Sequence, residues 1–369
     1  MKTIIQYITG LNDGGAEALV KDYAIRMCED GNRVIIVVKF AVKHTASFRL
    51  LEERAIDIIP IYDQFGIFAR LLNRIVPQLI PSLKLRKIVK KYNPDVIHVH
   101  LGLLHTLAPI RKCLRNVKVF YTCHSEADRF LGNLRPKEHL AALKLLQTNN
   151  LQIIALHDEM RKEINTLLNT DSTIVVRNGI DVRRFLNVPE SKSEIRRSIN
   201  VPEDAFVIGH VGRFDDVKNH AYLIRVFREV FKMNNNSFLL LIGSGPMERK
   251  IRQELGELNI LDKTVILSHR RDMPRLLKAM NVFVFPSLFE GFSIALLEAQ
   301  ASGLRCLIST KVNKESFVTE NAIAMDVSDS PSVWAKEIVN PVKKGKANRS
   351  IEEYDINHIV AELEKLYFA

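Results

Sequence analysis

Short apolar runs alternate with amphipathic stretches along the first half of the chain. The amphipathic stretches, such as Ala16–Cys28, have helical spacing, and the apolar runs between them predict strands. The predicted strands are Thr3–Ile8, Arg33–Val38, Val96–His100, Lys118–Tyr121, Ile153–Ala155 and Thr173–Val176. Strands that alternate with helices form βαβ units, so this pattern predicts a parallel sheet.

The same alternation starts again near residue 206. The strands predicted there are Phe206–His210, Ser237–Ile242, Thr264–Leu267, Val282–Phe285, Arg305–Ser309 and Ala322–Met325. The predicted helices between them are Ala221–Met233, Met247–Leu258, Met273–Met280 and Ser293–Ala301. We therefore expect a second parallel sheet with helices of its own.

A polar segment, residues 186–204, separates the two arrays. Two prolines in it flank a short charged helix, which is typical of a linker. We therefore predict two domains, residues 1–186 and residues 187–351, a number that suits a chain of 369 residues. The helical pattern over residues 352–369 follows the second array, and we expect it to pack back on the first domain.

Composition excludes several classes of protein. Hydrophobic residues make up 47% of the chain and charged residues 26%, as in globular proteins. Apolar runs such as Phe238–Ile242 are far shorter than the ~18 residues that span a bilayer. Nothing near Met1 resembles a secretory signal, and the four cysteines form neither a CxxC pair nor a zinc pattern. We therefore expect a cytoplasmic protein with reduced thiols and no metal site.

The net charge of +11 is distributed unevenly. Residues 1–180 contain 26 Lys/Arg and 17 Asp/Glu, whereas residues 181–369 contain 27 and 25. A basic excess can indicate nucleic acid, an anionic membrane surface or an acidic ligand as partner. Whichever it is, the partner would meet the first domain.

A glycine-rich turn follows the first predicted strand and includes Gly14 and Gly15. Glycines between a strand and a helix let the backbone approach an anion at the helix N-terminus. The spacing is not G-x-G-x-x-G, so a nicotinamide cofactor has little support. A tight turn that needs positive φ explains the glycines equally well.

Two loops of the second array carry candidate anion-binding residues. Arg213 and Lys218 follow the strand that ends near residue 211. An arginine fork and a lysine ammonium beside a helix start suit a diphosphate, whereas a pair of solvated surface charges is the plainer interpretation. The next strand ends in the turn Gly243–Pro246, again in front of a helix.

The stretch over residues 286–298 is the richest in candidate chemistry. Glu290 lies on the predicted loop, and Glu298 lies about one turn inside the following helix. Ser293 is the expected N-cap, so the amides of Phe292–Ile294 can face an anion. Two carboxylates placed in this way can bind different hydroxyl groups of one ligand. The alternative is a loop acid and a partly buried helix acid without a ligand.

Taken together, these motifs resemble the family 4 retaining glycosyltransferases, which have the GT-B fold. The resemblance rests on the E-x7-E element from Glu290 to Glu298 and on shorter motifs in the family's order: Gly14–Glu17, Pro94–His100, Thr122–His124, Arg177–Asp181, Gly212–Lys218 and Gly243–Pro246. It covers about residues 1–310 and is strongest toward enzymes that build bacterial capsule, exopolysaccharide or lipopolysaccharide. It implies an α/β protein whose two Rossmann-like, doubly wound parallel-sheet domains face a central cleft.

The resemblance also implies roles for matching residues. Arg213 and Lys218 would hold the donor diphosphate and stabilise it as it leaves. Glu298 would bind the nucleotide ribose, and Glu290 would contact the donor sugar near its reacting end. His124 would approach the same sugar from the first domain.

Further donor contacts are implied for backbone groups and for the nucleobase pocket. The amides of Phe292, Ser293 and Ile294 would meet sugar hydroxyls and phosphate, as would the turns at Gly15 and Gly243. The base would lie near His269 and Arg270. His98, His100, His105 and His220 are expected to be structural, and among them His100 has the best claim to a catalytic role because it ends a strand at the expected cleft.

The implied reaction needs no cofactor beyond the donor substrate. The donor would be a nucleotide-diphosphate sugar, with a UDP-sugar expected, and the acceptor a glycan on a polyprenyl diphosphate lipid. No Asp-x-Asp motif is present, so we expect fixed cations and helix amides to stabilise the departing diphosphate without a metal. Retention of configuration is expected, by departure and attack on one face.

Two alternatives remain open from the sequence. A non-hydrolysing nucleotide-sugar epimerase of the same fold would bind the same donor and need no acceptor. A basic nucleic-acid-binding protein without catalytic activity would explain the charge. However, the basic residues are not interleaved with aromatic ones, and no nucleic-acid-reading motif appears.

Most of the basic excess lies between Gln64 and Pro94. This stretch has no Asp or Glu but seven Lys/Arg, and its apolar residues follow helical spacing. A basic amphipathic pair of helices suits docking on an anionic membrane leaflet, so we predict peripheral membrane contact through residues 64–94. The alternative is that the apolar faces belong to the core and the charges are solvated.

Overall fold

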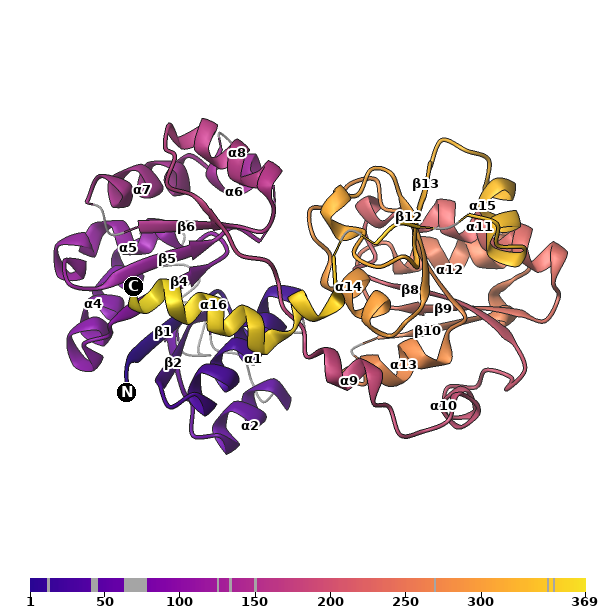
Figure 1. The fold of residues 1–369 in the computed structure, drawn as a ribbon, viewed down its shortest axis with the longest axis horizontal. Coiled ribbons are helices and arrows are strands. Elements are labelled where there is room, and N and C mark those ends of the chain that lie inside the picture. Colours follow the sequence, from indigo (N-terminus) through magenta and orange to yellow (C-terminus); the bar gives the residue numbers. More distant parts are fainter. Residues whose placement is uncertain are drawn as a thin grey trace. The chain divides into compact units, whose positions relative to one another are not determined.

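The computed structural model describes residues 1–11, 14–40, 46–62, 78–124, 126–132, 135–148, 151–268, 270–343, 345–347 and 349–369. The chain divides into two compact units, which Figure 1 shows as two sheets with their helices. Unit 1 consists of Met1–Gly179 together with Ile356–Ala369, and unit 2 of Ile180–Asp355.

Unit 1 is built on a seven-stranded parallel sheet in the order β3-β2-β1-β4-β5-β6-β7. Its strands are β1 (Thr3–Ile8), β2 (Arg33–Phe40), β3 (Asp57–Tyr62), β4 (Val96–His100), β5 (Lys118–Thr122), β6 (Leu151–Ala155) and β7 (Ile174–Val175). The order reverses direction at β1, as in doubly wound folds. Helices on both faces explain why β1 and β4 are almost continuous runs of buried residues.

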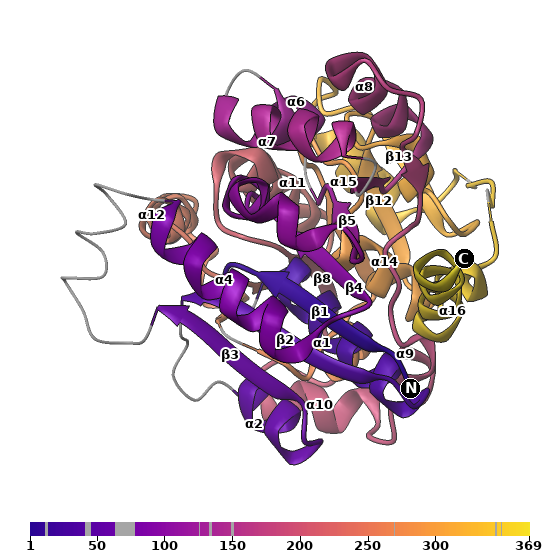
Figure 2. The same ribbon diagram turned by 90° about the vertical axis from the view of Figure 1, so that its left-hand side faces the viewer.

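The helices of unit 1 cover both faces of this sheet. They are α1 (Gly15–Glu29), α2 (Ala46–Glu53), α4 (Leu79–Tyr92), α5 (Leu104–Leu107), η1 (Ala108–Leu114), α6 (Ala127–Leu131), α7 (Pro136–Gln147), α8 (Asp158–Leu168) and α16 (Ile356–Phe368). Figure 2 shows α4 and α16 on opposite sides of the sheet. The interior between sheet and helices is the hydrophobic core of the unit.

The C-terminal helix α16 belongs to unit 1 although unit 2 precedes it in the chain. Its Tyr367 is 1% exposed, and the hydroxyl lies 2.5 Å from Nδ1 of His98 in β4. Asn32 Nδ2 donates to the Glu364 carboxylate at 2.7 Å. A buried aromatic contact with β4 and a polar contact with the turn before β2 therefore help to attach the helix to unit 1.

Unit 2 repeats the doubly wound order with six parallel strands, β10-β9-β8-β11-β12-β13. They are β8 (Phe206–Val211), β9 (Ser237–Ile242), β10 (Thr264–Leu267), β11 (Val282–Phe285), β12 (Arg305–Ser309) and β13 (Ala322–Met325). The helical segments are α9 (Val182–Leu186), α10 (Lys192–Ser198), η2 (Asp216–Lys218), α11 (His220–Met233), α12 (Glu248–Glu257), η3 (Leu261–Lys263), α13 (Met273–Ala279), α14 (Ile294–Ala301), η4 (Lys314–Ser316), α15 (Pro331–Val339) and η5 (Ile351–Tyr354). One face packs α11 and α15 around Trp334, whose indole N–H donates to Asp326 O at 2.8 Å.

The expected fold class and nearly all expected elements are confirmed by this structure. The exception among the strands is β3, which the sequence analysis did not predict. Pro60 interrupts its apolar run, and a proline lacks the N–H that a central strand needs. Because β3 is at the edge of the sheet, one of its sides has no strand to bond.

The boundary between the units differs from the predicted one. We expected residues 180–186 in the first domain, but α9 packs against α13 and α14 and so belongs to unit 2. The predicted terminal helix over 352–369 is two elements, η5 in unit 2 and α16 in unit 1. The first part of the predicted basic pair, residues 63–77, lies outside the described residues. No helix in the part of the chain that the structure describes is long and apolar enough to cross a bilayer.

Candidate functional site

Arg213 and Lys218 lie in the loop between β8 and α11 of unit 2. Asp215 caps the short turn η2 within it, because its carboxylate accepts a hydrogen bond from the Lys218 backbone N–H at 3.3 Å. The Arg213 side chain is exposed and, among the described residues, makes no hydrogen bond or ion pair. The loop therefore presents one exposed guanidinium and one partly buried ammonium at the carboxyl end of β8.

Glu290 lies in the loop after β11 and forms an ion pair with Lys218. The side chains are 14% exposed for Lys218 and 22% for Glu290, so the pair is largely shielded from water. The ammonium also lies 4.9 Å from the ring centre of Phe285, the last residue of β11. Leu288 N–H donates to Val217 O at 2.8 Å and ties the two loops together. The neighbouring strands β8 and β11 thus bring two predicted site residues into contact.

Gly243 allows the turn after β9 to lie against the turn after β8. Its φ is +153°, and a Cβ would come within 1.9 Å of Gly212 O. Gly245 is restricted in the same way, since a Cβ there would lie 2.4 Å from Phe214 O. These contacts support the loop that carries Arg213 and give both glycines a structural role. The donor contact expected of Gly243 stays a prediction.

Glu298 lies in the second turn of α14 and is partly buried. Ser293 occupies the N-cap position, as predicted, but its hydroxyl makes no capping hydrogen bond. The side chains of Phe292 and Ser293 are buried, and Phe292 stacks on Tyr354 with ring centres 5.5 Å apart. A ligand contact from Phe292–Ile294 would therefore come from backbone N–H groups.

Arg270 is engaged in a local ion pair. Its Nε donates to Asp272 Oδ1 at 2.8 Å and its Nη2 to Oδ2 at 2.5 Å. This bidentate contact lowers the pKa of the Asp272 carboxyl, and Arg275 adds a further cation at 2.8 Å. His269 lies outside the described residues. The nucleobase contact expected of both residues stays a prediction.

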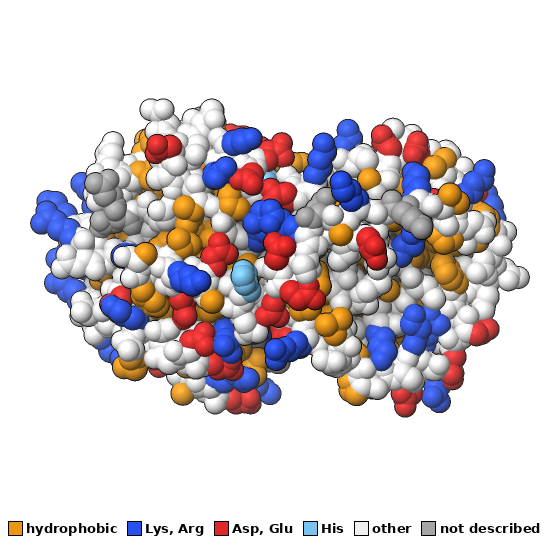
Figure 3. Space-filling model, viewed as in Figure 1, with side chains coloured by type: hydrophobic (Ala, Val, Ile, Leu, Met, Phe, Trp, Pro, Cys, Tyr) orange, Lys and Arg blue, Asp and Glu red, His pale blue; other side chains and the backbone are white. Residues whose placement is uncertain are grey.

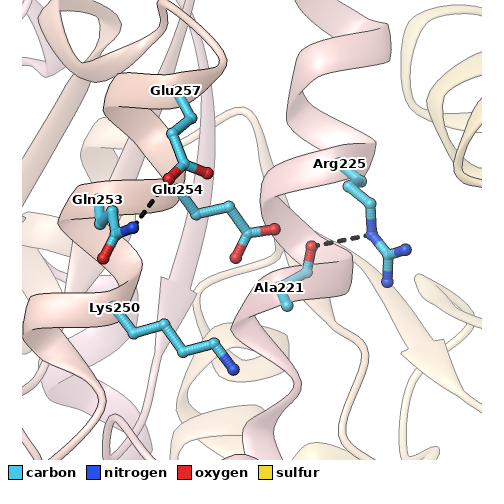
Figure 4. Close-up of a pocket in the computed structure, with 6 residues that line it drawn as sticks. All are labelled: Ala221, Arg225, Lys250, Gln253, Glu254 and Glu257. Carbon is cyan, nitrogen blue, oxygen red and sulfur yellow. Dashed lines mark hydrogen bonds between the residues drawn. The ribbon is translucent and has the colours of Figure 1, made fainter.

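A surface hollow of about 580 Å³ lies between α11 and α12 (Figure 4). Its lining consists of Ala221, Arg225, Lys250, Gln253, Glu254 and Glu257. Figure 4 shows Arg225 donating to the carbonyl of Ala221 within its own helix, at 3.2 Å. None of the predicted site residues lines this hollow, so it is not part of the candidate site.

His124, one of the two predicted site residues of unit 1, belongs to a chain of hydrogen bonds. Its Nε2 lies 2.8 Å from Nδ1 of His100, and Nε2 of His100 lies 2.8 Å from Gln6 Oε1. An amide oxygen only accepts, so His100 Nε2 carries the proton. Gly15 begins α1 in the same unit. Its expected donor contact, like that of His124, stays a prediction.

This chain of bonds determines the tautomer of His124. Burial lowers the pKa of His100 well below its usual value and that of His124 to about 4, so both rings are neutral at pH 7. A neutral His100 protonated at Nε2 must accept at Nδ1, and His124 Nε2–H must therefore donate to it. The remaining nitrogen of His124, Nδ1, then carries a lone pair that can accept a hydrogen bond from a hydroxyl group.

Gln6 is the functional candidate that the sequence analysis missed. It lies in an apolar run as a polar residue that is fully buried in β1. A glutamine inside a central strand needs hydrogen-bond partners within the protein. A polar residue in this apolar run could therefore have indicated a buried polar network. His100, expected to be structural, is the link between Gln6 and His124.

Comparisons with known proteins agree with this geometry. The models of "Glycosyltransferase Family 4" and "Glycosyl transferases group 1" match residues 13–184 and residues 191–358. An uncharacterized glycosyltransferase of Methanocaldococcus jannaschii is 30% identical over 302 residues, which cover 76% of each chain. The chain is a family 4 glycosyltransferase.

Other relatives of this glycosyltransferase span most of its length. The putative glycosyltransferase EpsF of Bacillus subtilis is 26% identical over 386 residues, with 99% of this chain and 96% of EpsF covered. An Escherichia coli enzyme named UDP-Gal:alpha-D-GlcNAc-diphosphoundecaprenol alpha-1,3-galactosyltransferase is 26% identical over 305 residues, with 77% and 78% covered. The Anabaena HepE structure with UDP and glucose superposes with a TM-score of 0.79 at 18% identity, over 99% of both chains. The fold is GT-B, as expected.

We predict that the buried histidines make the protein sensitive to acid. Burial lowers the pKa of His98 to about 3 and that of His124 to about 4, whereas an unfolded histidine titrates near 6.5. Each group therefore contributes stability above pH 6.5 that is lost as the pH falls toward the folded pKa. At pH 5.5 the loss is about 1.4 kcal/mol for each such histidine.

Urea unfolding at pH 7.5 and pH 5.5 measures this effect. His98→Gln keeps polar atoms for its two partners but removes the titration, so the difference between the two pH values should shrink by about 1.4 kcal/mol. His358→Gln, at an exposed position of α16, should leave the difference unchanged. An unchanged pH dependence in His98→Gln would contradict the prediction.

We further predict that the His124 ring is protonated at Nε2 and not at Nδ1. Long-range 1H–15N spectra of protein labelled at histidine distinguish the two neutral tautomers, and His124→Gln assigns the signal. Gln6→Leu removes the acceptor for His100, which should allow both rings to adopt the opposite tautomers. A His124 signal from an Nδ1–H ring in the wild-type protein would refute the assignment.

Proposed function

We propose that this glycosyltransferase moves a sugar from a nucleotide-diphosphate sugar to a lipid-linked glycan, with retention of configuration and without a metal ion. The proposed setting is the synthesis of a bacterial surface polysaccharide. The observation that carries the proposal is the ion pair of Lys218 and Glu290, on a loop that also holds Arg213. This pair lies at the ends of two neighbouring strands, where the cations would serve a departing diphosphate and the carboxylate a donor sugar.

In the proposed reaction the bond between the anomeric carbon and the diphosphate oxygen breaks, and its electron pair stays on the diphosphate. Arg213 and Lys218 would stabilise this charge, because fixed cations act most strongly where negative charge develops. The acceptor oxygen bonds to the anomeric carbon on the same face, and its proton passes to the leaving phosphate oxygen. Atoms and charges then balance without a nucleophile from the protein.

The ion pair would also couple donor binding to sugar positioning. Glu290 forms an ion pair with the Lys218 ammonium of the loop after β8. A bound diphosphate would become the new partner of Lys218, since a phosphate carries more negative charge than a carboxylate. The Glu290 carboxylate could then accept a hydrogen bond from a hydroxyl group of the donor sugar.

The donor is proposed to be a UDP-sugar, with Glu298 at its ribose. HepE, which shares the fold, is described in complex with UDP-glucose, and the Escherichia coli relative carries UDP-Gal in its name. The names of that relative and of a Campylobacter jejuni enzyme, 32% identical over 99 residues, include a diphospho-undecaprenol acceptor. These names support a nucleotide-sugar donor and a polyprenyl-diphosphate acceptor for this chain. They favour transfer over the epimerase and nucleic-acid-binding alternatives.

Helix α4 supports the proposed membrane contact on the cytoplasmic face. Leu79 and Leu83, one turn apart, are 55% and 49% exposed, while Leu85, Ile88 and Val89 are buried in unit 1. The helix contains no acidic residue, and its exposed basic residues are Arg86, Lys87, Lys90 and Lys91. Basic side chains gather along the edge of unit 1 where α4 lies (Figures 1 and 3). Exposed leucines beside cations suit an anionic leaflet.

We predict that Lys218→Met and Glu290→Gln each reduce sugar transfer by about 10²- to 10³-fold, because each removes a charge used in the transition state. The assay measures nucleoside diphosphate release from the nucleotide-sugar that stabilises the protein in a thermal-shift screen. Lys232→Met is the matched control, since Lys232 forms an exposed ion pair with Glu229 in α11. Full activity in both site variants would contradict the proposal.

We predict that α4 binds vesicles that contain anionic lipid. The affinity for anionic vesicles in co-sedimentation should fall at least about 30-fold in Lys87→Glu/Lys91→Glu, because each of the two lost cations contributes about 1 kcal/mol near the leaflet. Leu83→Ser should weaken binding without changing its salt dependence. Lys112→Glu, at an exposed position of η1, is the control. Equal binding to neutral vesicles, or none to anionic ones, would refute the contact.

A further inference from the structure

Lys39, at the carboxyl end of β2, is a buried cation with no direct partner among the residues that the structure describes. It is 9% exposed, and its ammonium makes no hydrogen bond or ion pair within the described part of the chain. The Lys39 Nζ lies 5.5 Å from the centre of the Phe40 ring. Burial lowers the pKa of Lys39, and the nearby Glu138 carboxylate acts in the opposite direction. Lysines are seldom buried to this extent unless they are paired.

Tyr121, near the carboxyl end of β5, presents a second unsatisfied group. Its side chain is fully buried, and its hydroxyl has no hydrogen-bond partner among the described residues. Burial raises the pKa of Tyr121, Glu138 adds to the increase and Arg135 opposes it. The hydroxyl therefore stays protonated and is a donor for which the described residues supply no acceptor. An oxygen atom of a ligand could accept this hydrogen bond.

Glu138 in α7 lies near both residues but is not available to either as a direct partner. It is 3% exposed, accepts a hydrogen bond from the His105 backbone N–H at 3.3 Å and is also bonded to the His105 ring. Its charge reaches Lys39 and Tyr121 through space. Glu138 thus helps to keep Lys39 charged while its own oxygens serve His105.

Arg135, the N-cap residue of α7, lies close to the backbone after β4, where Gly102 has no side chain. A Cβ at Gly102 would lie 2.5 Å from Arg135 Nη1 and 3.5 Å from Glu138 Oε1. Leu101, just before it, has a φ of +62°, which a leucine seldom adopts. Strain of this kind persists where the surroundings enforce it, and it is frequent at binding sites.

We propose that Lys39, Tyr121 and Arg135 bind a phosphate group of the acceptor substrate. All three are near the carboxyl ends of strands in unit 1, where open α/β sheets bind their ligands. An ammonium, a guanidinium and a phenol from different elements suit a tetrahedral group with several oxygens better than a planar carboxylate. The assignment to the acceptor rests on the proposed function, whereas binding of a phosphate does not.

The test is a thermal-shift titration of the full chain with inorganic pyrophosphate and with farnesyl diphosphate. It is run in the wild-type protein and in Arg213→Ala, so that the donor loop cannot account for the signal. We expect stabilisation in both proteins. Lys39→Met should raise the concentration for the half-maximal shift about tenfold or more, because a charge-assisted bond is lost. Lys118→Met, at the exposed start of β5, is the matched control and should behave as the wild type.

Tyr121→Phe separates a ligand contact from a structural role. Removal of an unsatisfied buried hydroxyl should raise the melting temperature of the free protein and weaken the response to pyrophosphate. A lower half-maximal concentration for farnesyl diphosphate than for pyrophosphate supports a lipid-linked source, and equal values support a free phosphate compound. No shift in the wild type, or equal shifts in Lys39→Met, would overturn the site. If the wild-type protein binds phosphate at this site but transfers no sugar from any nucleotide-sugar, the proposed function is wrong and the phosphate site still stands.

Discussion

Hydrogen bonding between parallel strands is the constraint on which the rest of this structure depends. Because every strand in a unit points the same way, all the loops that leave carboxyl ends lie at one edge of the sheet. In unit 2 that edge brings Lys218 and Glu290 together, although 72 residues separate them in the chain. In unit 1 the corresponding edge holds His124 and the side chains around Lys39. The chemistry of both units follows from strand direction.

Much of this was predictable from local patterns, and what was not depends on contacts across the sheet. Runs such as Val96–His100 are buried on both faces and have the composition of central strands, so their bounds were predicted well. The E-x7-E spacing identified Glu290, but only strand order shows that its partner is Lys218. Gln6 was overlooked because its role depends on His100, which the sheet places beside it. Strand β3 was overlooked because its Pro60 argues against a central strand, and only the strand order shows that β3 lies at the edge of the sheet.

The charges of the chain serve different purposes in the two units. Unit 2 is close to neutral in sequence, and its site relies on a few cations whose surroundings are fixed by glycine contacts and by an ion pair. Unit 1 carries most of the basic excess on the surface of α4, where side chains are solvated. Its buried groups are instead mainly neutral, as the three histidines near β4 show. The total charge therefore describes a surface and not the catalytic chemistry.

The attachment of α16 to unit 1 has a consequence for how the chain matures. Unit 1 is discontinuous, because the whole of unit 2 is inserted before its last helix. Tyr367, which packs beside His98 and Phe120, is therefore synthesised only after the whole of unit 2. A growing chain can therefore complete unit 2 first, whereas the core of unit 1 remains open until α16 has been synthesised. The first unit to be translated is thus the last to close.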